Sequence, residues 1–170
     1  IQCTEGLTLK TGIILAGGNS KRMGQDKALL FSNVDRLASE LSSSGCTRII
    51  VMCGPVERQS LFEHETIPDK FDNLGESLIH VIAEIDGFIQ LAPCDAYLAD
   101  SNLFKSINGV PVDDLGNRQP LMSGFNSEIK LNQSKKISDI FANLPSCDGG
   151  KKARNFNTIE DLKEIGLVPR

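Results

Sequence analysis

The sequence predicts one α/β domain, with a mostly parallel central sheet and helices on both of its faces. The chain has 170 residues, of which 40% are hydrophobic, and this is enough to bury a single core. Short apolar runs that end in glycine or proline are typical of strands buried on both faces. Helical patterns separate these runs, and such an alternation favours a parallel sheet. We therefore treat residues 1–170 as one domain.

The first half of the chain shows the alternation most clearly. An apolar run that ends in glycines predicts a first strand at 12–17, and a helical pattern follows at 34–45. A second apolar run predicts a strand at 49–53. A helix with apolar residues on one face is predicted at 76–87, and a third strand follows directly at 88–92.

Beyond the third strand the alternation loosens. The last helix is the best marked element there, because Thr158 and Asp161, three positions apart, resemble a capping box. The predicted elements of this half are helices at 101–107, 137–144 and 158–165, a strand at 120–125 and a turn at 113–118.

Composition argues against several classes of protein. A net charge of -4 and a pI near 5.2 provide no basic field for nucleic acid or for an anionic membrane. No apolar run approaches a membrane span or a signal peptide, and the five cysteines form no C-x-x-C pair, so we expect a cytoplasmic protein. The two histidines, His64 and His80, are isolated, which leaves carboxylates as metal ligands and favours Mg²⁺.

The stretch 15-LAGGNSKRMGQDK-27 follows the first strand and is the clearest candidate site. Glycines at the carboxyl end of a buried strand let backbone N–H groups approach an anion, and open α/β sheets bind ligands there. The spacing fits neither the G-x-x-x-x-G-K-S/T loop nor the G-x-G-x-x-G motif. Lys21, Arg22 and Lys27 supply charge suited to a nucleoside triphosphate. The alternative is a surface turn with solvated lysines.

A second candidate lies in 91-LAPCDAYL-98, where a strand delivers Asp95 at its carboxyl end. In a parallel sheet this end lies at the same edge as the glycine loop, so Asp95 could carry Mg²⁺ to the phosphates. The alternative is that Asp95 caps the turn that follows Pro93. Two stretches far apart in the sequence thus converge on one predicted site.

Three stretches together resemble the molybdenum cofactor guanylyltransferases of the MobA type: Leu15 to Lys27, Pro93-Cys94-Asp95 and 155-NFNTIEDL-162. The resemblance implies a Rossmann-like nucleotidyltransferase fold. It also implies transfer of GMP from GTP to molybdopterin or its molybdenum-loaded form, with release of pyrophosphate and with Mg²⁺ as cofactor. Transient contacts with cofactor-synthesis or acceptor proteins would follow from this role.

The resemblance also implies roles for individual residues. The terminal phosphate of molybdopterin would be the nucleophile, and its second pKa of about 6 makes a general base unnecessary. The implied catalytic residues are Arg22, Lys27 and Asp95, and Asp95 is also the implied metal ligand. The implied acceptor-binding residues are Asn155 and Asn157. The implied nucleotide-binding residues are Leu15, Ala16, Gly17, Gly18, Lys27, Asp69 and Asp95.

The chain departs from the family at several points, which keeps alternatives open. Met52 stands where the family often has an asparagine that helps to hold the nucleotide, so the base is not settled. The chain is also shorter than the family after Leu30 and around 72–77. The basic run 151-KKAR-154 could attract the pterin phosphate or form a solvated loop. The alternatives are a transferase with CTP or another acceptor, and a GTP-binding module without catalysis.

Overall fold

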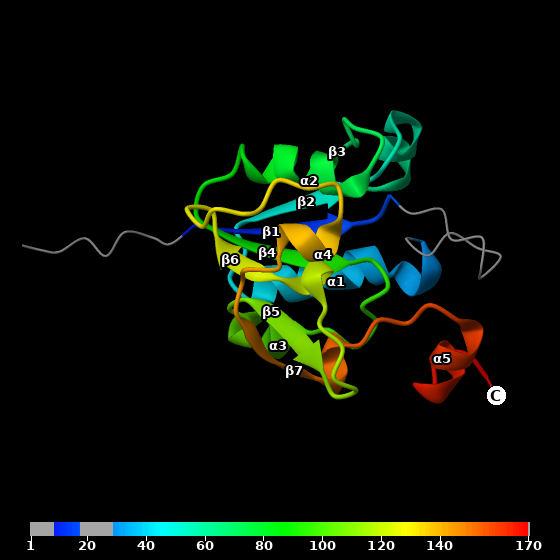
Figure 1. Cartoon of the computed structure of the whole chain (residues 1–170). Helices are drawn as coiled ribbons and strands as arrows, with labels where there is room; N and C mark the ends of the chain where they lie inside the picture. Colours follow the sequence, from blue (N-terminus) through cyan, green and yellow to red (C-terminus); the bar gives the residue numbers. More distant parts are fainter. Residues whose placement is uncertain (1–8, 18–28, 170) are drawn as a thin grey trace, which may run out of the picture.

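The structure, a computed structural model, describes residues 9–17 and 29–169. The central sheet consists of β1 (Lys10–Leu15), β2 (Arg48–Met52), β3 (Glu65–Ile67), β4 (Phe88–Pro93) and β6 (Gly124–Asn126). Their order across the sheet is β3-β2-β1-β4-β6 (Figure 1). The first four strands run parallel, and β6 is antiparallel to β4. The prediction of a mostly parallel sheet is confirmed.

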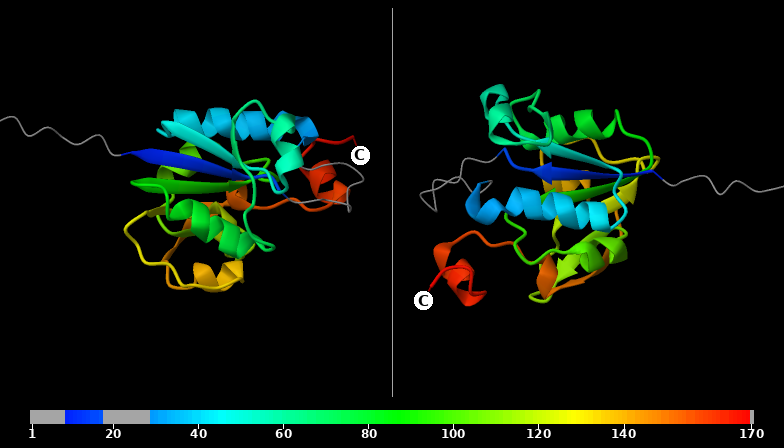
Figure 2. Two further views of the ribbon diagram at one scale, coloured as in Figure 1. Left: turned by 90° about the horizontal axis from the view of Figure 1, so that it is seen from above. Right: turned by 180° about the vertical axis from the view of Figure 1, so that it is seen from behind.

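Helices cover both faces of this sheet, as predicted (Figure 2). Successive residues of β1 face opposite sides, so that Ile14 packs in the core beneath the first helix and Ile13 in the core on the other face. Burial on both faces is why the strands are continuous apolar runs in the sequence. One face carries α1 (Asn33–Ser43) and α3 (Ser101–Ser106), and the other carries α2 (Leu74–Ile82) and α4 (Ile137–Ile140).

The second half of the chain adds a small parallel sheet of β5 (Val110–Asp113) and β7 (Ser146–Gly150). The last helix, α5 (Ile159–Glu164), begins at the predicted capping box, in which Thr158 and Asp161 exchange both hydrogen bonds. Short 3-10 segments lie at Leu30–Ser32, Val56–Leu61, Pro120–Met122 and Lys151–Ala153.

Two sequence predictions in this half need correction, and one strand was not predicted. The strand predicted at 120–125 is a 3-10 turn followed by β6, because Pro120 begins a helical turn rather than an extended one. The helix predicted at 137–144 ends at Ile140 and continues as turns. The polar, glycine-rich segment 146–150 is a strand, although no apolar pattern in the sequence predicts one there.

Within the part of the chain that the structure describes, no helix is both long and apolar enough to cross a bilayer.

Candidate active site

The candidate site lies where the carboxyl ends of β1, β2 and β4 meet, at the right-hand edge of the sheet in Figure 1. Leu15 of β1 is in register with Met52 of β2 on one side and with Pro93 of β4 on the other. The chain order reverses at β1, since β2 and β3 lie to one side of it and β4 to the other. Such a switch point is where open α/β sheets bind ligands.

The loops that leave β1 and β2 touch through two glycines. A Cβ on Gly17 would lie 2.8 Å from the Cα and backbone nitrogen of Gly54, which itself has a φ of +79°. Neither position therefore accepts a side chain without displacing backbone. The structure therefore explains why glycine is needed at both positions, while the predicted contact of Gly17 with a nucleotide stays a prediction.

Arg58 ties the same two loops together. Its Nε donates to the carbonyl of Cys53 at 2.8 Å, and its Nη2 donates to the carbonyl of Ala16 at 2.7 Å. No pattern in the sequence predicts this contact, because nothing local connects Arg58 with a carbonyl 42 positions earlier.

Asp69 lies beside these loops, two residues beyond the end of β3. Its backbone N–H donates to the carbonyl of Gly54 at 2.8 Å. Its Oδ1 is buried, and no described residue forms a hydrogen bond with it. Burial raises the pKa of this carboxyl above its ordinary value, and a backbone hydrogen bond from Gly54 partly opposes the shift. A buried acceptor without a partner is costly, so it suits a residue that meets a ligand.

Met52 is the last residue of β2. Its side chain is 1% exposed and packs in the core on the α2 side, together with Leu78. The residue at this position is therefore a packing residue of the core.

The loop after β4 brings Asp95 to the edge. The backbone N–H of Cys94 donates to the carbonyl of Leu15 at 3.1 Å, which extends the β1–β4 pairing to the residue before Asp95. Asp95 is partly exposed. Among the described residues no group of three or more His, Cys, Asp or Glu side chains could hold a metal ion. A single accessible carboxylate fits Mg²⁺, which binds one or two carboxylates, substrate phosphates and waters.

The segment with the two predicted acceptor asparagines packs against the same loop. Phe156 is 2% exposed, and its ring centroid lies 6.2 Å from that of Tyr97, two residues beyond Asp95. Asn155 and Asn157 flank this anchor, and Asn155 is exposed. Apolar packing of one residue therefore places two amides near the Asp95 loop.

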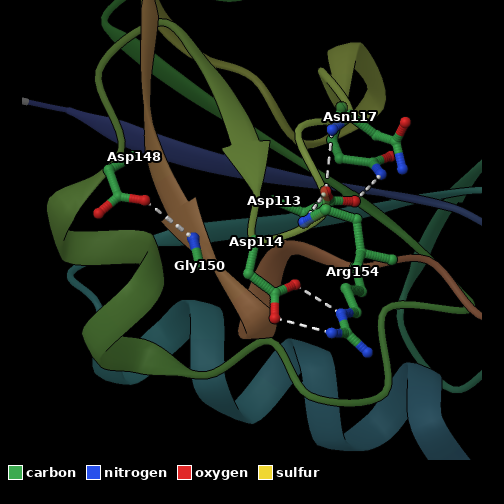
Figure 3. Close-up of polar contacts among 8 residues, drawn as sticks. Asp113, Asp114, Asn117, Asp148, Gly150 and Arg154 are labelled. Atoms are coloured by element: carbon green, nitrogen blue, oxygen red, sulfur yellow. Dashed lines mark hydrogen bonds and ion pairs between the residues drawn. The ribbon is translucent and has the colours of Figure 1, made fainter.

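Two cations of the basic run before Asn155 pair with carboxylates of the protein itself. Arg154 forms two hydrogen bonds with Asp114, at 2.5 and 2.7 Å (Figure 3). Lys152 forms an ion pair with Asp100. Asp114 belongs to a turn that Asp113 organises by accepting hydrogen bonds from backbone N–H groups within it. These two cations thus fasten the segment that leads to Asn155.

Four residues singled out in the sequence, Gly18, Lys21, Arg22 and Lys27, lie outside the described residues. Their roles stay predictions. The structure does place Leu15, Ala16, Gly17, Asp69 and Asp95 along one edge of the sheet. The shared edge of the glycine loop and Asp95 was predicted from the parallel strands, whereas no sequence pattern predicted β3, the strand before Asp69.

Solved structures share this fold at low identity. Bifunctional IspDF from Campylobacter jejuni is 20% identical, with a TM-score of 0.69 over 92% of this chain and 54% of that one, so this chain spans about half of that protein. Rv0371c from Mycobacterium tuberculosis H37Rv is 16% identical, with a TM-score of 0.67 over 95% and 98% of the two chains. Protein Aq1419 from Aquifex aeolicus VF5 is 17% identical, with a TM-score of 0.66 over 90% and 96%.

No curated protein matches the chain in sequence. The family model of the MobA-like NTP transferase domain matches residues 12–109, more than half of the chain. The matched region runs from β1 past β4 and thus contains the edge at which Gly17, Asp69 and Asp95 lie. The sequence match and the site geometry agree: this chain is a nucleotidyltransferase domain and belongs to the MobA-like NTP transferase domain family.

Proposed function

We propose that the chain transfers GMP from GTP to molybdopterin, or to its molybdenum-loaded form, and releases pyrophosphate. The observation that carries the proposal is that the loop with Asp95 starts at the sheet edge where the glycine loop also starts, and that Phe156 packs against Tyr97 of the Asp95 loop, with Asn155 and Asn157 on either side of it. The sequence from Leu15 to Lys27, which resembles the MobA type, argues for this reaction over others of the family.

The triphosphate would lie over the loops of Gly17 and Gly54, where the two backbones come close. Asp95 would hold Mg²⁺, which when bound would neutralise charge on the phosphates. Lys27 and Arg22 would stabilise charge that builds on the departing pyrophosphate. Asp69, with its unpaired buried oxygen, would accept a hydrogen bond from the nucleotide.

The acceptor phosphate needs no deprotonation at neutral pH, so positioning is the main task of the protein. Asn155 and Asn157 can donate amide hydrogen bonds to the pterin or its phosphate from the Asp95 side of the edge. This role fits a cytoplasmic protein that passes its product to acceptor proteins through transient contacts.

The test is incubation of the chain with molybdopterin, Mg²⁺ and one of GTP, CTP or ATP, followed by mass analysis and pyrophosphate detection. The expected result is a guanine dinucleotide in the GTP reaction, lost in Asp95→Asn. Glu65→Gln is the matched control, since Glu65 is an exposed carboxylate at the amino end of β3. A product with CTP instead would indicate a cytidylyltransferase, and GTP binding without any product would indicate a binding module.

A further inference from the structure

Two polar residues of α1, Asn33 and Arg36, reach out of the helix to the loop that follows β4. We propose that these two residues, the α1 clamp, are positioning residues that hold Asp95 in place for metal and nucleotide. The inference rests on the proposed function for the role of Asp95. It does not depend on which base or acceptor the enzyme uses.

The clamp consists of four hydrogen bonds in a chain. Asn33 Nδ2 donates to the carbonyl of Cys94 at 2.8 Å, and Asn33 Oδ1 accepts from Arg36 Nε at 2.7 Å. The other nitrogens of the Arg36 guanidinium donate to the carbonyl of Ala96 at 2.8 Å and to that of Ala99 at 2.6 Å. The peptide groups held this way lie on both sides of Asp95.

The chemistry of the clamp requires these residue types. The planar guanidinium has donors directed along fixed vectors, so that one side chain can serve Asn33, Ala96 and Ala99 at once. A lysine has one nitrogen and cannot reproduce this geometry. Asn33 is 2% exposed, and removal of Arg36 would leave its Oδ1 buried without its present donor.

The clamp is separate from the contacts that attach α1 to the sheet. The helix is anchored by a buried apolar face that includes Val34, Leu37 and Leu41, which belong to the core below it. Asn33 and Arg36 instead bond to loop carbonyls 60 to 63 residues away. Loss of the clamp should therefore leave the fold intact and release the loop. Groups that act this way on metal ligands typically change metal affinity or activity by about 10- to 100-fold.

The experiment compares Arg36→Gln with Arg48→Gln. Arg48 is the matched control because it also makes a two-bond contact, with Glu65, but it is exposed and lies at the amino end of β2. We expect Arg36→Gln to raise the Mg²⁺ concentration for half-maximal turnover by about 10- to 100-fold. The KM for GTP at saturating Mg²⁺ should change much less. Arg36→Lys, the milder variant, should fall between Arg36→Gln and the wild type.

Hydrogen–deuterium exchange of the peptide that covers 94–99 gives a readout that needs no substrate. Protection of this peptide should fall in Arg36→Gln and Arg36→Lys, and stay unchanged in Arg48→Gln. Unchanged protection, or a Mg²⁺ requirement shifted no more than by Arg48→Gln, overturns the clamp. Lost protection in a protein whose wild type transfers no GMP would instead support the clamp and refute the proposed function alone.

Discussion

The contact between Gly17 and Gly54 predicts how three glycine-to-alanine substitutions will differ. In Gly17→Ala the new Cβ would lie 2.8 Å from backbone atoms of Gly54, about 0.6 Å inside the 3.4 Å at which ordinary contact begins. The obstacle is backbone on both sides, so no rotamer change can relieve it. Overpacking of this kind typically lowers the free energy of unfolding by about 1–3 kcal/mol.

Substitution of two further glycines separates the steric clash of an added Cβ from the strain of a positive φ, both measured as a change in the free energy of unfolding. Gly116 has a φ of +85°, and an added Cβ would meet nothing within 4 Å, so Gly116→Ala tests conformation alone and should lower the free energy of unfolding by about 1–2 kcal/mol. Gly54 combines a φ of +79° with the clash, so Gly54→Ala should lower it by roughly 2–5 kcal/mol.

The assay is urea unfolding followed by far-UV circular dichroism, because the chain contains no tryptophan for fluorescence. Equilibrium binding of GTP is measured on the same variants. Gly17→Ala should weaken binding because it separates the loops that leave β1 and β2, whereas Gly116→Ala should leave binding unchanged. Wild-type stability and wild-type GTP binding in Gly17→Ala would refute the close approach of the two loops.

Three further predictions concern charge at the site. Asp95→Ala should nearly abolish turnover without unfolding the protein, whereas Cys94→Ser should keep appreciable activity; full activity of Asp95→Ala in the pyrophosphate assay would contradict the metal role. Lys27→Ala should lower kcat by roughly 100- to 1000-fold, more than it weakens GTP binding. Lys21→Ala is its control, and equal small losses in both variants would show that the two lysines are merely solvated. Burial raises the pKa of Asp69 in the folded protein above its value in the unfolded chain. The protein should therefore be more stable at low pH, where Asp69 is protonated, and lose stability as the pH rises from the pKa of Asp69 in the unfolded chain to its pKa in the folded protein. Asp69→Asn should therefore increase the free energy of unfolding at neutral pH, with a gain that vanishes in acid, while it weakens nucleotide binding; a gain independent of pH would rule out the buried charge as its cause.

Local signals in the sequence determined much of this protein. The apolar runs predicted β1, β2 and β4, because a strand that is buried on both faces carries apolar residues at successive positions. The capping box predicted where α5 begins, since both of its hydrogen bonds join residues three positions apart. The parallel order of the strands then placed Gly17 and Asp95 at one edge.

Only the tertiary structure decided how that edge is held together. Arg58 bonds to a carbonyl 42 residues away, and Arg36 to carbonyls 60 and 63 residues away. Neither contact could be predicted from neighbouring residues, because the sequence around such an arginine is the same whether its guanidinium faces water or bonds to a distant loop. The strand β7 was also decided by a distant part of the chain. Its polar, glycine-rich residues are extended because the backbone of β5 lies beside them, and backbone hydrogen bonds are formed whatever the side chains.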